Sequence, residues 1–201
     1  MCFRTKNNKT HKQLEDRFKA QFLTPEWYTP DIFNAFTFPM TPVITNENTD
    51  AIQGFSWGLI PPWAKDTNIR KSTLNARLET IDQKPSFKPS LSKRCLVLAD
   101  GFFEWKWLDP KGKAKQKYLL TLPGEEAFAF AGLWNSWSNK STGEVLNTYT
   151  IITTAANDLM SEIHNTKKRM PVILNPETEK DWLNGGDLMM QNDQLQAFES
   201  E

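Results

Sequence analysis

The chain has 201 residues, 39% of them hydrophobic and 24% charged, a composition that predicts an ordinary globular protein with a single domain over 1–201. Its 24 basic and 24 acidic side chains cancel, so overall charge gives no argument for a polyanionic partner. Two cysteines exclude a disulfide framework and a four-cysteine metal site.

The first predicted element is an amphipathic helix over 10–23. Thr10 and Gln13 suit a capping box, and apolar residues recur every four positions at Leu14, Phe18 and Phe22. The next segment, 25–42, is rich in proline and aromatic residues and predicts irregular but ordered structure. The polar, basic N-terminus lacks the apolar stretch of a signal peptide.

Strand patterns dominate the middle of the chain. One strand is predicted over 51–58, and a rigid aromatic loop follows at Ile60-Pro61-Pro62-Trp63, since proline forbids helix there. A mostly non-helical basic stretch comes next. Strand signals then resume at 94–107, 117–122, 127–134 and 145–154. Turns are expected at Asp109-Pro-Lys-Gly, beside a lysine-rich hairpin, and at Pro123-Gly124.

The last third predicts helices over 155–164 and from Asn175-Pro176 to a terminating Gly185, with Trp182 and Leu183 buried. The C-terminal residues, about 15 of them, would form an appended helix or tail docked by Met189, Met190, Leu195 and Phe198. The sum is a strand-rich, mostly antiparallel α+β domain with peripheral helices. No apolar run reaches membrane-spanning length, so we expect a cytoplasmic protein that binds no membrane.

Charge is distributed unevenly along this neutral chain. Eight basic residues and three acidic residues lie between Lys65 and Arg94, whereas the segment from Asn175 to Glu201 holds seven acidic residues and one lysine. This pattern is typical of a protein with a basic face and an acidic tail. Solvated surface charge explains it equally well.

Cys2 directly follows Met1. If Met1 is removed, residue 2 carries a free α-amine beside its thiol, a pair that no internal cysteine offers. The amine, with a pKa of about 7.7–8.0, can condense with an aldehyde to an imine. The thiol, the stronger nucleophile once ionised, can then close a thiazolidine ring. A cysteine also occurs at position 2 by chance, so Cys2 alone supports no function. Cys95, in an apolar run, indicates a buried strand residue.

Other polar residues stand in settings that suggest chemistry. Glu104 lies within Phe-Phe-Glu-Trp, where desolvation would favour general acid or base use, although a solvent-facing strand position explains it too. His164, at the end of a predicted helix, suits a proton donor or an ordinary structural histidine. Asn75 and Arg77 alternate along an extended segment and could share a face.

Two tryptophans of the aromatic stretch have different expected roles. Trp57 is predicted to pack in the core. Trp63, in the proline-rich loop, is a candidate for exposure and for stacking on unpaired bases.

Five islands of sequence, in order, resemble the SRAP family (SOS-response-associated peptidase-like), whose members shield abasic sites in single-stranded DNA. The islands are Met1-Cys2-x-Arg4; Trp57-Gly58 with Ile60-Pro61-Pro62-Trp63; Asn75-Ala76-Arg77-x-Glu79-Thr80; Ala99-Asp100-Gly101-Phe102-Phe103-Glu104-Trp105; and Ile163-His164 with Arg169-Met170-Pro171-Val172-Ile173-Leu174. The resemblance spans residues 1 to about 185. Two departures are Phe3, where members often have glycine, and the longer spacing between His164 and Arg169.

The resemblance implies a barrel-like sheet core and a covalent trap for the aldehyde form of an abasic sugar. Cys2 would form the imine and the thiazolidine, Asn75 would hold it, and Glu104 would shuttle protons. His164 would bind the opened sugar. The residues implied in DNA binding are Arg4, Arg77, Arg169, Lys168, Trp63 and Pro39. Weak strand cleavage by β-elimination would follow from an imine. The implied protein is a monomer without metal or cofactor, and its partner is single-stranded DNA with abasic sites, which would place it on the nucleoid.

Two other functions fit the same residues. A thiol hydrolase would use Cys2 as nucleophile, His164 as base and Asn75 as an orienting partner, and could process the Met1–Cys2 bond itself. A non-covalent binder of single strands would use only the basic and aromatic residues, with Cys2 incidental.

Overall fold

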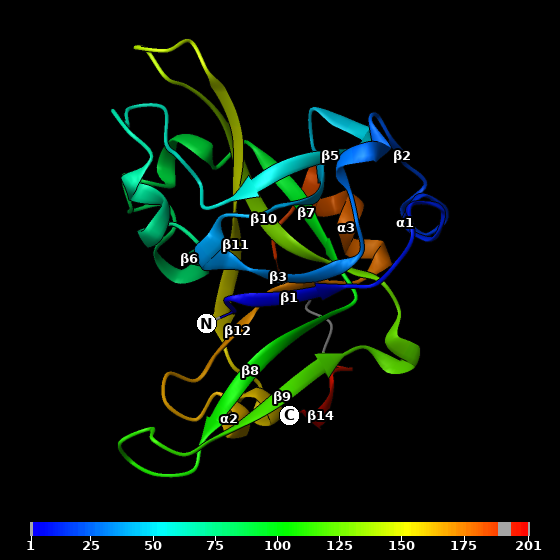
Figure 1. Ribbon diagram of the computed structural model, residues 1–201, viewed down its shortest axis with the longest axis vertical. Coiled ribbons are helices and arrows are strands. Elements are labelled where there is room, and N and C mark those ends of the chain that lie inside the picture. The colour runs from blue at the N-terminus through cyan, green and yellow to red at the C-terminus, as the bar shows by residue number, and fades with distance from the viewer. Residues whose placement is uncertain (1, 189–193, 201) are drawn as a thin grey trace.

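The computed structural model describes residues 2–188 and 194–200, and strands account for most of its regular structure (Figure 1). The strands are β1 (Arg4–Asn7), β2 (Gln21–Phe22), β3 (Asp31–Asn34), β4 (Met40–Thr45), β5 (Asn48–Trp57), β6 (Asn75–Arg77), β7 (Arg94–Ala99), β8 (Gly101–Trp107), β9 (Lys115–Thr121), β10 (Phe128–Ser138), β11 (Val145–Ala155), β12 (Arg169–Pro171), β13 (Ile173–Leu174) and β14 (Gln196–Ser200). The α-helices are α1 (His11–Phe18), α2 (Asp158–Ile163) and α3 (Pro176–Leu183).

Five strands close into a barrel. Their order is β11-β10-β7-β4-β5, and β5 returns to β11 through the parallel pairs Ser56–Thr148 and Trp57–Tyr149. The other four pairings around the barrel are antiparallel. The predicted strand-rich α+β fold with a barrel-like core is therefore confirmed.

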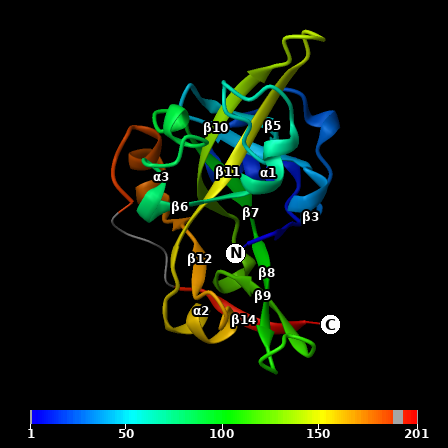
Figure 2. The ribbon, with the colours of Figure 1, turned by 90° about the vertical axis from the view of Figure 1, so that its left-hand side faces the viewer.

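A second sheet, in the order β14-β9-β8-β1-β3, packs against one end of this barrel. β1 lies between β8 and β3, with Thr5 opposite Phe102 and Arg4 opposite Asn34. The residues before β1 are thereby brought beside β8. The β10–β11 hairpin projects from the other end of the molecule (Figure 2).

The side-chain alternation of the strands builds two apolar clusters, one on each side of the barrel wall. Along β7, Cys95 and Val97 enter a first cluster that includes Trp57, Phe102 and Tyr149. Leu96 and Leu98 enter a second cluster that α1 and α3 cover. Cys95 is a buried strand residue and Trp57 is fully buried, as predicted.

The helices α1 and α3 begin where the sequence indicates, but α1 ends earlier than predicted. The helix predicted over 155–164 begins only at Asp158, because Ala155 is the last residue of β11 and Asn157 is the N-cap of α2. The Thr10–Gln13 capping box is present, but Lys19 adopts a left-handed conformation with φ of 55° and ends the helix at Phe18. The predicted helix over 10–23 was therefore too long, because Gln21 and Phe22 pair with β5. Asn175 caps α3, and Trp182 and Leu183 are buried as expected. The Gly185 amide donates to the Trp182 carbonyl, and Gly185 has φ of 96°.

Two predictions about the irregular segments were wrong. Residues 25–42 contain β3 and the start of β4. The many prolines and aromatic residues of this segment gave no alternating pattern from which strands could be predicted. The C-terminal segment, predicted as an appended helix or tail, contains strand β14 paired with β9, so the helix alternative was wrong. Leu195 is buried and Phe198 is exposed. The predicted contacts of Met189 and Met190 lie outside the described residues. Within the described part, no helix has the length and apolar character to cross a membrane.

Candidate active site

The site forms around Cys2, which immediately precedes β1. Cys2 is fully buried in the first cluster. Its Sγ lies 4.0 Å from the carbonyl oxygen of Arg4, and the side-chain amide Nδ2 of Asn75 donates to the Cys2 carbonyl oxygen over 2.9 Å. Asn75 is held because β6 pairs in parallel with β11, opposite Ile151. Oδ1 of Asn75 accepts no hydrogen bond from the described residues.

Glu104 brings a carboxyl group to the same region from β8. Its side chain is only 4% exposed, so the position is buried and does not face solvent. It shares a strand face with Phe102, and both neighbours in sequence are aromatic. A cavity of about 260 Å³ is lined by Glu104 together with Phe3, Trp105, Trp107, Lys115, His164, Thr166 and Lys167.

The surroundings of Cys2 favour a neutral thiol. Burial raises the pKa of the Cys2 thiol far above its ordinary value, and the negative charge of Glu104 raises it further. The thiol is therefore protonated at neutral pH. Any reaction through sulfur needs a partner that accepts its proton, and the nearby Glu104 carboxylate is one such group.

His164 completes the group of four predicted catalytic residues. It lies at the C-terminal end of α2 and its amide donates to the Met160 carbonyl. Its Nδ1 is 2.8 Å from the Arg169 carbonyl oxygen and 3.3 Å from the Arg169 amide nitrogen. These contacts fix the ring from one side while His164 and Glu104 line one cavity.

The predicted phosphate contacts lie in different settings. Arg77 and Lys168 are exposed, and Lys168 has φ of 47°. The guanidinium of Arg4 lies 5.9 Å from the Trp105 ring. Arg169 is buried, where its guanidinium donates to both carboxylate oxygens of Glu79 and to the Thr153 carbonyl.

The other two residues implied in DNA binding, Trp63 and Pro39, lie outside the strands. Trp63 is 54% exposed, which confirms its predicted exposure, and its Nε1 donates to the Pro85 carbonyl. Pro39 is half-buried before β4, and its carbonyl accepts from the Trp57 amide. Trp57 in turn donates from Nε1 to the Leu74 carbonyl, directly before Asn75.

Phe3, one of the two departures from the family pattern, lines the cavity, and sequence reasoning missed four other lining residues: Trp105, Trp107, Lys115 and Thr166. The alternating aromatic residues of 102–107 were visible. Lys115 lies opposite Trp107 because of the register between β8 and β9. No local sequence pattern reveals that register.

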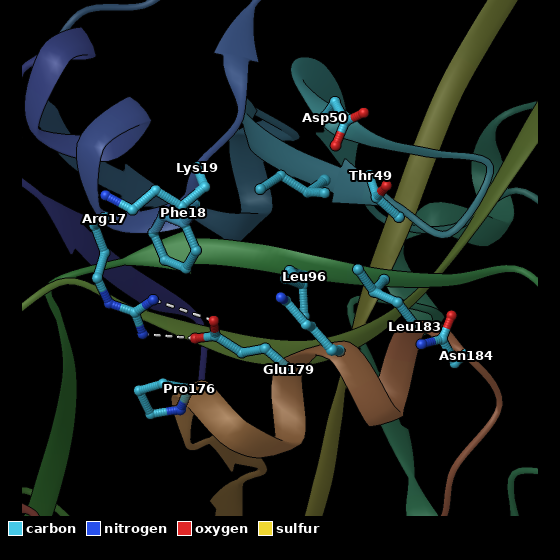
Figure 3. Close-up of a pocket in the computed structure, with 12 residues that line it drawn as sticks. Arg17, Phe18, Lys19, Thr49, Asp50, Leu96, Pro176, Glu179, Leu183 and Asn184 are labelled. Carbon is cyan, nitrogen blue, oxygen red and sulfur yellow. Dashed lines mark hydrogen bonds and ion pairs between the residues drawn. The ribbon is translucent and has the colours of Figure 1, made fainter.

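A second cavity, of about 460 Å³, lies between α1 and α3 (Figure 3). Its floor includes Ile44 and Leu96 of the second cluster, so the barrel wall separates it from Cys2. Arg17 donates to both carboxylate oxygens of Glu179 there, so the buried Glu179 carboxylate is paired with a partly exposed guanidinium. The described residues that line this cavity include no cysteine or histidine. No metal-binding group of three or more His, Cys, Asp or Glu residues occurs among residues 2–188 and 194–200.

Comparisons with known proteins identify relatives of this chain. A family model described as SOS response associated peptidase (SRAP) matches residues 1–200. The abasic site processing protein YoqW of Bacillus subtilis is 47% identical over 82% of this chain and 71% of its own length. YoaM of the same organism, another abasic site processing protein, is 42% identical over 92% of this chain and 79% of its own length.

Two solved structures have a similar fold. A crystal structure of a protein from Bacteroides thetaiotaomicron has a TM-score of 0.87 and 37% identity, and covers 100% of this chain and 92% of that one. A protein from Bordetella bronchiseptica shares the fold, with a TM-score of 0.81 at 24% identity over the whole of both chains. The chain described here therefore belongs to the SRAP family.

Proposed function

We propose that this protein processes abasic sites in single-stranded DNA by forming a thiazolidine crosslink through Cys2. The observation that carries the proposal is that four distant parts of the sequence bring Cys2, Asn75, Glu104 and His164 to one region. Asn75 holds the Cys2 carbonyl at 2.9 Å, and Glu104 and His164 line the adjoining cavity. The names of the relatives YoqW and YoaM, both abasic site processing proteins, support the same substrate.

The reaction needs the α-amine of Cys2, so Met1 must first be removed. The amine then attacks C1′ of the open-chain sugar, and loss of water gives an imine. The thiol adds across the C=N bond, so that sulfur bonds to carbon and the proton ends on nitrogen. The raised pKa of the thiol means that this proton has to be transferred during the step, and Glu104 is placed to relay it.

His164 would bind the hydroxyl that the sugar exposes on ring opening. Its Nδ1 is already held by Arg169 backbone atoms, which sets the ring orientation before substrate arrives. The imine also activates the neighbouring carbon–hydrogen bond, so slow strand cleavage by β-elimination is expected as a side reaction.

Binding of the single strand would rest on Arg4, Arg77 and Lys168 at phosphates, with Trp63 and Pro39 separating the flanking bases. The phosphate contact of Arg169 stays a prediction. In this structure its terminal nitrogens already donate hydrogen bonds to Glu79 and Thr153. Phosphate contacts set position and carry no sequence information, so low sequence preference is expected. We expect a monomer that acts on DNA in the cytoplasm.

A thiol hydrolase would need a different environment. Catalytic cysteines are activated by a lowered thiol pKa beside a histidine cation or a helix N-terminus. Burial and Glu104 raise the pKa of the Cys2 thiol instead. A purely non-covalent binder would leave unexplained why Asn75 anchors residue 2 inside a cluster of titratable groups.

The test is incubation of Met1-processed protein with a single-stranded oligonucleotide that carries one abasic site, followed by denaturing electrophoresis. A shifted band that survives denaturation is expected, and a uracil oligonucleotide never converted to the abasic form should give none. The Cys2→Ala variant should lose the band and keep salt-sensitive binding. Peptide turnover by the parent protein without any DNA adduct would establish the hydrolase and reject the proposal.

A further inference from the structure

The β8–β9 hairpin extends the site away from the barrel and carries basic residues that the proposed reaction does not use. It lies beside α2, below the barrel in Figure 1. Its turn and second strand carry four lysines, Lys111, Lys113, Lys115 and Lys117. Only some of these belong to the site: Lys115 lines the cavity of Glu104 and His164, whereas Lys111 and Lys113 do not.

The cavity continues along the hairpin. A second hollow, of about 490 Å³, is lined by residues 107–110 together with Asn165 and Thr166. The two hollows share Trp107 and Thr166. The two hollows therefore border each other at Trp107 of the hairpin and at Thr166 of the loop that follows His164.

Strand register positions Lys115 at the hollow that Glu104 and His164 also line. This lysine lies directly opposite Trp107 in the ladder, and its ammonium is 5.1 Å from the centre of the Trp107 ring. The ring is packed from the turn by Gly112, where an added Cβ would come within 2.6 Å of it. Trp107 is thus a fixed wall that holds the lysine at the cavity.

The loop after His164 is fastened to the same wall. The Asn165 side chain accepts from the Trp107 amide at 3.1 Å and donates to the Trp107 carbonyl at 2.9 Å. Loop and hairpin are therefore one unit, and Lys167 of the loop lines the cavity with Lys115. Residues Asn165 to Lys168 make up the longer spacing between His164 and Arg169. The extra residues therefore form the loop that packs against the β8–β9 hairpin.

The charges of this unit are available to a ligand. Lys106, on β8, forms an ion pair with Glu162 at 2.6 Å. Lys115 and Lys167 form none with the residues that the structure describes, and both are exposed. Two ammonium groups and the Thr166 hydroxyl around one hollow match the charge and hydrogen-bonding needs of a phosphodiester.

We propose that Lys115, Thr166 and Lys167 form a phosphate-binding subsite for the single strand where it leaves the abasic sugar. The inference rests on the proposed function, since it assumes a strand whose lesion lies between Cys2, Glu104 and His164. The subsite would hold a phosphate flanking the lesion and so fix the sugar for attack. It assigns a role to the inserted loop that the crosslinking chemistry by itself does not require.

The test measures non-covalent affinity for an oligonucleotide with a stable abasic analogue, in a Cys2→Ala background, across a range of salt concentrations. For single strands, the slope of log affinity against log salt falls by about 0.7 for each phosphate that the protein no longer neutralises. Lys115→Ala with Lys167→Ala should lower the slope by about 0.7, because both side chains are proposed to neutralise the same phosphate. The matched control, Lys111→Ala with Lys113→Ala, removes the same charge from the same hairpin outside the cavity and should change the slope far less.

A second measurement locates the phosphate. Replacing one linkage at a time with an uncharged methylphosphonate should weaken binding of the parent most at one linkage next to the lesion, and the Lys115/Lys167 double variant should lose that dependence. Equal slopes for both double variants, or the same methylphosphonate profile in parent and variant, would overturn the subsite. If Cys2-containing protein still crosslinks abasic DNA in that case, the proposed function survives; if it never crosslinks, that function fails first.

Discussion

At the scale of single residues, the site depends on a neutral amide. Asn75 donates to the Cys2 carbonyl, and an amide has no charge to perturb the thiol or the carboxyl group nearby. The arrangement holds residue 2 in place without adding a charged side chain at position 75.

The Asn75→Ala variant tests this role. Removing one hydrogen bond of about 1–1.5 kcal/mol should slow crosslinking roughly tenfold, because the amine then samples positions away from the sugar. The rate is followed as the growth of the denaturation-resistant band. Asn147→Ala, an exposed asparagine on β11, is the control and should crosslink at the parent rate. Equal rates for the two variants would show that the Asn75 hydrogen bond does not position Cys2.

The buried Arg169 illustrates what residue type alone leaves open. An arginine after the site histidine suggested a phosphate contact, but its side chain extends inward to Glu79 and Thr153. The ion pair lowers the pKa of the Glu79 carboxyl through the hydrogen bonds from Arg169. In this structure the arginine links the η4 turn (Leu78–Thr80) to β11 and so supports the strand that carries Asn75 and Arg77.

At the scale of elements, turns decide which side chains reach the site. Gly112 and Gly143 both have positive φ, of 64° and 76°, in hairpin turns. Their surroundings differ, because an added Cβ at Gly112 would strike the Trp107 ring, whereas Gly143 has open space around it. Both turns therefore need a left-handed residue, but only the glycine of the β8–β9 turn also packs against a side chain.

This difference predicts unequal effects of the same substitution. Gly143→Ala should lower the free energy of unfolding by about 1–2 kcal/mol, the cost of a left-handed alanine. Gly112→Ala should lower the free energy of unfolding by more than this, because the added Cβ also clashes with the Trp107 ring. The clash should move the ring and displace Lys115 from it. Urea unfolding measures the first effect, and faster amide exchange over 107–115 reports the second. Identical behaviour of the two variants would contradict the packed turn.

Local patterns predicted the elements whose signals lie within a few residues. The capping box of α1, the start of α3 at Asn175-Pro176 and the buried face of α3 follow from side chains a few positions apart. The alternating pattern of β5 is equally local. The strands β3 and β14 did not follow, because β3 is stabilised by pairing with β1, and β14 by pairing with β9, both distant in sequence. The end of α1 was missed because a left-handed lysine carries no sequence signal.

The same limit applied to the site. The four catalytic candidates came from motifs, and the resemblance to a family placed them together before any geometry was known. The wall formed by Phe3, Trp107 and Lys115 depends on the register of β8 with β9 and on the loop after His164, which only the folded chain brings together.

At the scale of the whole molecule, the barrel interior is unusually rich in weak acids kept neutral by burial. Cys2, Cys95 and Tyr149 all lie in the first cluster, and burial raises the pKa of each side chain. The barrel keeps water away from the Cys2 thiol. Because the same burial raises the pKa of these side chains, the free energy of unfolding depends on pH.

The sign of this dependence follows from the direction of the shifts. A thiol whose pKa is raised in the folded state contributes stability fully below its unfolded pKa of about 8.5, and that contribution declines as pH rises above it. Each thiol then lowers the free energy of unfolding by about 1.4 kcal/mol per pH unit. Between about pH 9 and 10 the parent protein should therefore lose stability steeply, before tyrosine or lysine ionisation adds to the effect.

Urea unfolding under reducing conditions at several pH values from about 8 to 10 measures this slope. Cys95→Ala removes one of the two titrating thiols and should reduce the slope by about half, although it lowers stability at every pH by leaving a cavity. Val97→Ala, two residues along the same buried face, leaves a cavity without removing a thiol and should keep the parent slope. If the Cys95→Ala and Val97→Ala curves run parallel, ionisation of buried sulfur does not govern the alkaline limit, and the Cys2 thiol is less isolated than its burial indicates.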